Sequence, residues 1–133
     1  MVSTDVYPGG IDKRNNKGIA RILRAARYSF TGFIAAIRCE AAFRQELALF
    51  VAMTPLAVWL GHTGTERALM IGSLFLVLIV ELLNSAVESV VDRVGMERHS
   101  LSGQAKDMGS AAVALSLINA ALVWALILWG HRV

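Results

Sequence analysis

Long apolar runs dominate the chain after residue 46. The segment 108–129 has no charged side chain over 22 residues, about the length that an α-helix needs to cross a bilayer. A second run, 47–65, is interrupted by Pro55, which a membrane helix tolerates when its neighbours satisfy the freed carbonyl. A third run, 68–80, reaches spanning length only if it continues past Glu81. The pattern therefore predicts three membrane crossings, at about 46–61, 67–91 and 107–130.

A different pattern precedes these runs. Between Ile19 and Ile37 the larger apolar residues recur at the spacing of one helix face, and the basic residues of this segment fall off that face. Such a basic amphipathic helix is typical of a segment that lies in the membrane surface, the alternative being a helix that faces a protein core. We expect this surface helix at about 19–38, after a disordered tail at 1–17.

Composition narrows the class of protein. The chain has 133 residues, of which 56% are hydrophobic and 17% charged, so it is short of charge for a soluble domain. The short length and the apolar composition exclude a large soluble enzyme and a disordered chain. A disulfide scaffold is excluded because Cys39 is the only cysteine. The prediction is one all-α integral membrane domain over 18–133, with a surface helix and three transmembrane helices. Nucleic acid is not expected as a partner.

The basic residues predict the orientation. Eight precede the first predicted crossing and three lie in the loop 93–107, whereas only Arg67 and Arg132 lie on the other side. Cytoplasmic loops carry the excess of Lys and Arg. The N-terminus and the loop 93–107 are therefore expected in the cytoplasm and the C-terminus outside, for a multi-pass protein of the cytoplasmic (inner) membrane.

Polar side chains follow one face of the predicted helix 67–91 and its extension. At about 100° per residue their offsets of 0, 3, 4, 7 and 11 form one narrow stripe. The members are Glu81, Asn84, Ser85, Glu88 and Asp92. Carboxylates within a membrane helix are costly, so a function is the first hypothesis and a polar seam between helices is the alternative.

Two further clusters flank the crossings. In the segment 39–46, Glu40 and Arg44 could form a surface ion pair, or the carboxylates could share a divalent cation with the stripe. In the segment 103–110, Lys106 is expected at a helix N-terminus, where anions such as phosphate are favoured; simple positive-inside charge is the alternative.

Common nucleotide and zinc motifs are absent from the sequence. The three histidines are isolated along the chain, and none is assigned to a metal. They are His62, His99 and His131. Any nucleotide chemistry would therefore use residues outside the common motifs.

Three segments together carry a resemblance to a known family. They are CEAAFRQE (39–46), ELLNSAVESVVDRVG (81–95) and HSLSGQAKDMGSAA (99–112), in this order. Over about 18–130 the chain resembles the bacterial membrane-integral diacylglycerol kinases. The resemblance implies transfer of the γ-phosphoryl group of MgATP to diacylglycerol, giving phosphatidate and ADP. It also implies a homotrimer whose active sites are shared between subunits.

The resemblance further implies roles for individual residues. Glu81 would be the general base and Asn84 would orient the reacting groups, with Lys106 and Asp107 also catalytic. The Mg²⁺ ligands would be Glu40 and Glu88. The nucleotide would contact Arg21, Tyr28, Glu40, Glu88, Glu97, Arg98, His99, Lys106 and Asp107. The lipid would contact Arg21, Ala42, Phe43, Arg44, Gln45, Glu46, Glu81, Ser110 and Trp124.

Two alternatives stay open at this point. An undecaprenol kinase would have the same architecture and a different lipid acceptor. A small proton- or cation-conducting helix bundle would use the stripe from Glu81 to Glu88 as its path, without need of Lys106 or Glu40.

Overall fold

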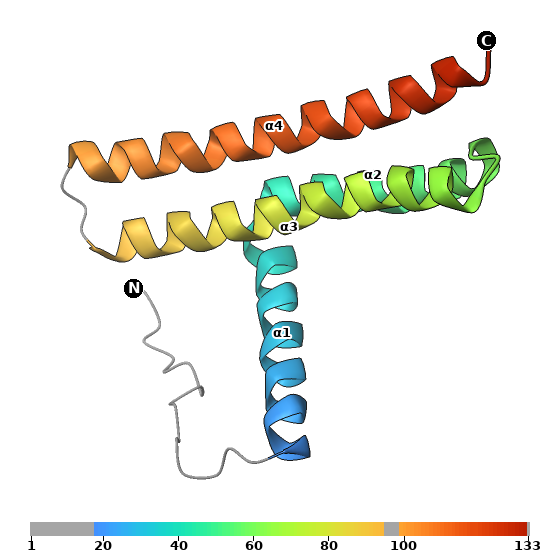
Figure 1. Ribbon diagram of the computed structural model, residues 1–133. Helices are drawn as coiled ribbons and strands as arrows, with labels where there is room; N and C mark the ends of the chain where they lie inside the picture. Colours follow the sequence, from blue (N-terminus) through green and yellow to red (C-terminus); the bar gives the residue numbers. More distant parts are fainter. Residues whose placement is uncertain (1–17, 95–98, 133) are drawn as a thin grey trace. The chain divides into compact units, whose positions relative to one another are not determined.

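The chain folds into α-helices joined by short connections. The computed structural model describes residues 18–94 and 99–132, and within these it contains four helices and no strand (Figure 1). The helices are α1 (Ile19–Cys39), α2 (Ala41–Leu60), α3 (Gly64–Val94) and α4 (Ser100–Gly130). The tail expected at 1–17 lies outside the described residues.

Three of these helices could cross a membrane by their length and composition. They are α2, with 20 residues, and α3 and α4, with 31 residues each. At about 1.5 Å per residue, α3 and α4 are roughly 46 Å long and exceed the 30 Å hydrocarbon core of a bilayer. The predicted fold class, an all-α membrane protein with three crossings, is confirmed.

The amphipathic segment forms α1. Contacts divide the chain into two compact units, of which the first ends at Ile34 and the second begins at Ala35, so most of α1 is described by itself. Its apolar residues Ile19, Ile22 and Phe30 are exposed, as expected for a face that meets lipid.

Within the second unit, α3 and α4 lie side by side in opposite directions, and α2 packs along α3 (Figure 1). One core cluster joins Ala57, Met70, Leu74 and Trp124, and the Trp124 indole donates a hydrogen bond to the Met70 carbonyl at 3.3 Å. The other core cluster consists of Ala36, Phe43 and Leu78. These contacts fix the register of the three helices that carry the predicted site.

The connection between α2 and α3 is tight. Arg67 Nε donates to the Gly61 carbonyl at 2.9 Å, and a β-carbon at Gly61 would meet the Arg67 side chain and the Ala57 carbonyl. Thr63 Oγ1 accepts from the Glu66 amide at 3.2 Å, while Glu66 Oε2 accepts from the Thr63 amide at 3.3 Å. This reciprocal capping box starts α3.

Candidate active site

The polar stripe of α3 lies on one face, as the sequence predicts. Glu81 and Ser85 are buried, with 4% and 8% of their surface exposed, and Asn84 and Glu88 are half-buried. Asn84 Nδ2 donates a hydrogen bond to Glu88 Oε1 at 3.2 Å. The structure therefore brings Glu81, Asn84 and Glu88 together along one side of α3.

Carboxylates from the start of α2 join this stripe. Glu81 is close enough to Glu40 and Glu88 for their charges to repel. Glu46 likewise experiences the charge of Glu81. Glu40 stands at the N-cap of α2, so the short break between α1 and α2 places its carboxylate near the stripe. A divalent cation relieves repulsion between carboxylates and prefers oxygen ligands. Among the described residues, however, no three of these carboxylates bring their oxygen atoms within 4.8 Å of one another, so substrate phosphates would have to complete such a site.

Three buried polar atoms of this region have no hydrogen-bond partner among the described residues. They are Glu46 Oε2, Asn84 Oδ1 and Ser85 Oγ. Leaving such atoms unpaired is costly, and buried polar atoms in native structures are normally satisfied by protein, water or ligand. These atoms therefore mark a place where an ion, a water or a substrate hydroxyl can bind.

Gly109 of α4 lies directly against Asn84. A β-carbon built at Gly109 would overlap Asn84 Oδ1. The glycine therefore allows α4 to approach the polar face of α3 closely.

At the other end of the stripe, Lys106 of α4 forms an ion pair with Asp92 at 2.6 Å. The predicted position of Lys106 at a helix N-terminus is wrong, because α4 begins earlier, at Ser100. His99 caps this start, with its Nδ1 accepting from the Leu101 amide at 3.2 Å. Lys106 therefore lies in the second turn and offers its ammonium group rather than free helix amides.

Asp92, like Ser85, belongs to the predicted stripe, but the sequence alone predicts no individual chemical role for it. It completes the same stripe as Glu81, and that periodicity was the available signal. Its pairing with Lys106 depends on the approach of α3 and α4, which the local sequence does not reveal.

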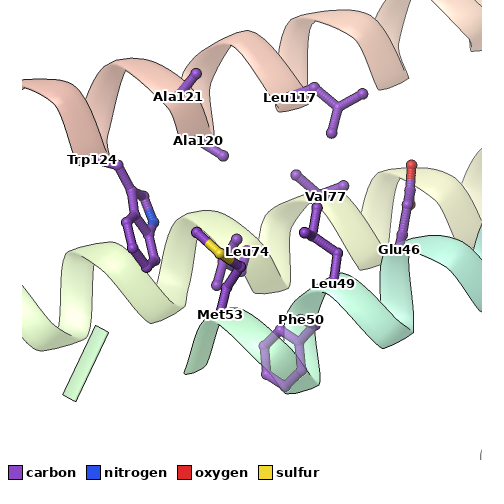
Figure 2. Close-up of a pocket in the computed structure, with 10 residues that line it drawn as sticks. All are labelled: Glu46, Leu49, Phe50, Met53, Leu74, Val77, Leu117, Ala120, Ala121 and Trp124. Atoms are coloured by element: carbon purple, nitrogen blue, oxygen red, sulfur yellow. The ribbon is translucent and has the colours of Figure 1, made fainter. Parts of the chain in front are cut away.

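An apolar cavity of about 230 Å³ lies between α2, α3 and α4 (Figure 2). Figure 2 shows Glu46 at one end of the labelled lining and Trp124 at the other. Both residues were predicted to contact lipid. The lining is apolar except for Glu46 and comprises Glu46, Leu49, Phe50, Met53, Leu74, Val77, Leu117, Ala120, Ala121 and Trp124. Such a cavity suits hydrocarbon rather than nucleotide.

The other residues assigned to lipid are spread more widely. Phe43 is fully buried in the core, and Arg44 Nη1 donates to the carbonyls of Ile37 at 3.1 Å and Arg38 at 3.4 Å. An ion pair between Arg44 and Glu40, the alternative that the spacing left open, is not formed in the structure described. The remaining members Ala42, Gln45 and Ser110 are exposed.

Several nucleotide-binding assignments are not tested by the structure. Arg21 and Tyr28 are exposed on the part of α1 that belongs to the first unit. Asp107 is exposed beside Lys106. Glu97 and Arg98 lie outside the described residues. These assignments stay predictions.

The expectation that all three histidines are isolated is wrong for two of them. The rings of His62 and His131 stack with centroids 3.8 Å apart, and His131 Nε2 lies 3.1 Å from Glu66 Oε2. No local pattern predicts this meeting, because only the antiparallel course of α3 and α4 brings residue 131 back to residue 66.

The amino-acid sequence of the chain is similar to those of known proteins. The family model described as "Prokaryotic diacylglycerol kinase" matches residues 27–128. The chain is 51% identical over 117 residues to the diacylglycerol kinase of Escherichia coli (strain K12), covering 88% of this chain and 96% of the relative. Identity to the Pseudomonas aeruginosa diacylglycerol kinase is 54% over 117 residues, covering 88% and 95%. The Haemophilus influenzae diacylglycerol kinase is 48% identical over 112 residues, covering 84% and 95%.

Proposed function

Because the chain belongs to the prokaryotic diacylglycerol kinase family, we propose that the face of α3 from Glu81 to Asp92 is its active site. The chain is a membrane-bound lipid kinase that transfers the γ-phosphoryl group of ATP to diacylglycerol, giving phosphatidate and ADP. The observation that carries the location is the buried Glu81 carboxylate in a spanning helix, in line with Asn84 and Glu88.

In this proposal Glu81 is the general base. It lies 11 residues before Asp92, or roughly 16 Å along the helix at 1.5 Å per residue, so the two ends of the stripe lie at different depths. A lipid hydroxyl reaches the deeper end and a nucleotide the shallower one. As the hydroxyl oxygen bonds to the γ-phosphorus, the bond to the β–γ bridging oxygen breaks and the hydroxyl proton passes to Glu81. Asn84 orients the reacting groups.

The cation proposed to accompany ATP is Mg²⁺, with Glu40 and Glu88 as its protein ligands. The fit rests on the repulsion among the carboxylates around Glu81 and on the unpaired oxygen of Asn84. Mg²⁺ is commonly held by one or two carboxylates together with substrate phosphates. When bound, it neutralises charge on the triphosphate, which phosphoryl transfer requires besides positioning.

The nucleotide phosphates are proposed to lie near Lys106. Its ammonium group forms an ion pair with Asp92 at the shallow end of the stripe. This ion pair keeps the positive charge of Lys106 beside the polar face of α3. His99 and Asp107 lie near Lys106 in sequence and remain proposed contacts. Arg21, Tyr28, Glu97 and Arg98 are retained from the family resemblance alone.

The lipid is proposed to place part of an acyl chain in the cavity between Glu46 and Trp124. Burial of hydrocarbon against this apolar lining is favourable. Glu46 lies at one end of the lining and is close enough to Glu81 for their charges to interact, so this end of the cavity lies near the proposed base. The residues Ala42 to Gln45 and Ser110 remain proposed contacts of the lipid path.

Assembly and location follow the same reasoning. We propose a homotrimer in the cytoplasmic membrane, with the N-terminus and the loop 93–107 in the cytoplasm. Large exposed apolar residues occur on each spanning helix, for example Val51, Leu83 and Leu126. Such side chains need lipid or a neighbouring subunit to cover them.

The alternatives are not favoured. The relatives compared above are all named for diacylglycerol, which favours this acceptor over undecaprenol. A conducting bundle does not account for the ion pair between Lys106 and Asp92 at the end of the stripe.

The test is Glu81→Gln in purified protein in detergent micelles with MgATP. A positioned general base contributes typically 10²–10⁴-fold, so phosphate transfer to diacylglycerol should fall by about that factor. Ser73→Ala on the same helix is the control, because Ser73 Oγ donates to the Met70 carbonyl within α3 and Ser73 is not part of the proposed site. Unchanged transfer in Glu81→Gln would remove the base role. Clear preference of the unaltered protein for a polyprenol over diacylglycerol would overturn the acceptor.

A further inference from the structure

Three metal-ligating side chains meet at the end of α3 far from the active site. His62 lies in the connection between α2 and α3, Glu66 in the first turn of α3, and His131 directly after α4. One ligand atom from each lies within 4.8 Å of the other two. Segments far apart in the sequence thus supply two imidazole nitrogens and one carboxylate oxygen at one point.

The contacts in this cluster are close. His131 Nε2 is 3.1 Å from Glu66 Oε2, and the His62 and His131 rings stack with an interplanar angle of 12°. Because the lone pair of an imidazole nitrogen lies in the ring plane, one of the two stacked rings has to rotate about its side-chain bonds before both nitrogens point at one ion. Glu66 and His131 are half-buried and His62 is exposed. The site is therefore partly shielded and still open to an ion from solution.

The carboxylate is also held in place by the backbone. Glu66 Oε2 accepts from the amides of His62 at 2.7 Å and Thr63 at 3.3 Å. Hydrogen bonds that orient a ligand in this way are a regular feature of metal sites, where they reduce the ordering that binding requires.

We propose that His62, Glu66 and His131 bind a divalent transition-metal ion of the Zn²⁺ class. Two imidazoles and one carboxylate form a known ligand set for Zn²⁺, with water in the fourth position. Mg²⁺ and Ca²⁺ prefer all-oxygen sites, so this cluster and the carboxylates around Glu81 select different ions. The ion joins the end of α4 to the start of α3.

This site is separate from the proposed kinase chemistry. Glu66 precedes Glu81 by 15 residues, or roughly 22 Å along α3 at 1.5 Å per residue, so one ion cannot serve both. The competing explanation is a hydrogen-bonded His131–Glu66 pair that stacks on His62 and binds no metal.

The test uses untagged, full-length protein that has been treated with a chelator and placed in excess Mg²⁺, which occupies the all-oxygen site. Zn²⁺ is then titrated by calorimetry, and Co²⁺ replaces it for an absorption spectrum. We expect one Zn²⁺ per chain, nitrogen-ligated Co²⁺ bands, and binding at least about 100-fold weaker in His62→Gln and His131→Gln. His99→Gln, which removes the histidine at the other end of α4, should bind Zn²⁺ as the unaltered protein does.

Thermal unfolding supplies a second measurement, because an ion that binds only the folded protein raises its melting temperature. Zn²⁺ should raise it for the unaltered protein and for His99→Gln, and not for His62→Gln or His131→Gln. Absence of Zn²⁺ binding at micromolar concentrations in the unaltered protein would overturn the proposal. Equal affinity in the double variant His62→Gln/His131→Gln would overturn it too.

Discussion

Adding one methyl group at Gly109 probes the contact on which the active-site geometry depends. In Gly109→Ala the new β-carbon would overlap Asn84 Oδ1, while Asn84 Nδ2 donates to Glu88 at 3.2 Å. Either the Asn84 side chain leaves this position and loses its hydrogen bond, or α3 and α4 move apart. Both outcomes disturb the proposed site.

The magnitude follows from these two routes. Overpacking typically costs about 1–3 kcal/mol, and a hydrogen bond to a charged group is worth about 1.5–3 kcal/mol. Either route therefore costs about 1–3 kcal/mol, and if this cost appears in the activation barrier, kcat/KM falls roughly 5- to 160-fold, at 1.36 kcal/mol for each factor of ten.

The assay is the initial rate of phosphate transfer to diacylglycerol in micelles, with thermal unfolding measured in parallel. Gly103→Ala on the same helix is the control, since a β-carbon there meets nothing within 4 Å. The double variant Gly109→Ala/Asn84→Ala should be about as stable as Asn84→Ala, because the overlap is gone. Equal rates for Gly109→Ala and Gly103→Ala would refute the reasoning.

Two further substitutions separate function from packing. Lys106→Ala should raise the KM for ATP roughly 10- to 100-fold, because a charged contact to phosphate is lost. The melting temperature should stay unchanged, because the ion pair of Lys106 with Asp92 is largely exposed. An unchanged KM would exclude contact between Lys106 and phosphate. Phe43→Ala should destabilise the protein by about 3–5 kcal/mol, measured by denaturation, because Phe43 is fully buried; a stable variant with only a raised KM for diacylglycerol would instead support the predicted lipid contact.

The sequence predicted best the features that depend on periodicity within one helix. The stripe from Glu81 to Glu88 repeats at helical spacing, so its shared face follows without knowledge of the rest of the fold. Two of the crossings follow from the length of the uncharged runs 47–65 and 108–129 in the same way, and the third requires the run 68–80 to continue as a helix past Glu81. These are local properties that tertiary contacts do not alter.

The features that the sequence did not reveal depend on how helices pack. The start of α4 at Ser100 shows this, because the uncharged run begins only at Met108 and the preceding two turns are polar yet helical. Gly109 against Asn84 and Lys106 against Asp92 both require the register between α3 and α4. The amino-acid sequence does not contain this register, so it does not show which polar residues of α3 and α4 are in contact.

The His62–Glu66–His131 cluster is the clearest case of this kind. Its members are separated by up to 69 residues, and each has an ordinary local explanation as a loop or helix-end residue. The residue types were visible, whereas their meeting point follows only from the antiparallel course of α3 and α4.

The burial of Glu81 bears on how the protein enters its membrane during synthesis. The α3 segment is made before α4 and carries Glu81 and Glu88 after its uncharged run 68–80. An acidic side chain at the centre of an inserting helix costs about 2.5–3.5 kcal/mol, whereas the segment 108–129 has no charge to oppose its entry. Pairing with α4 gives the polar face of α3 protein neighbours in place of lipid. This favours delivery of α3 and α4 into the bilayer together, as a helical hairpin.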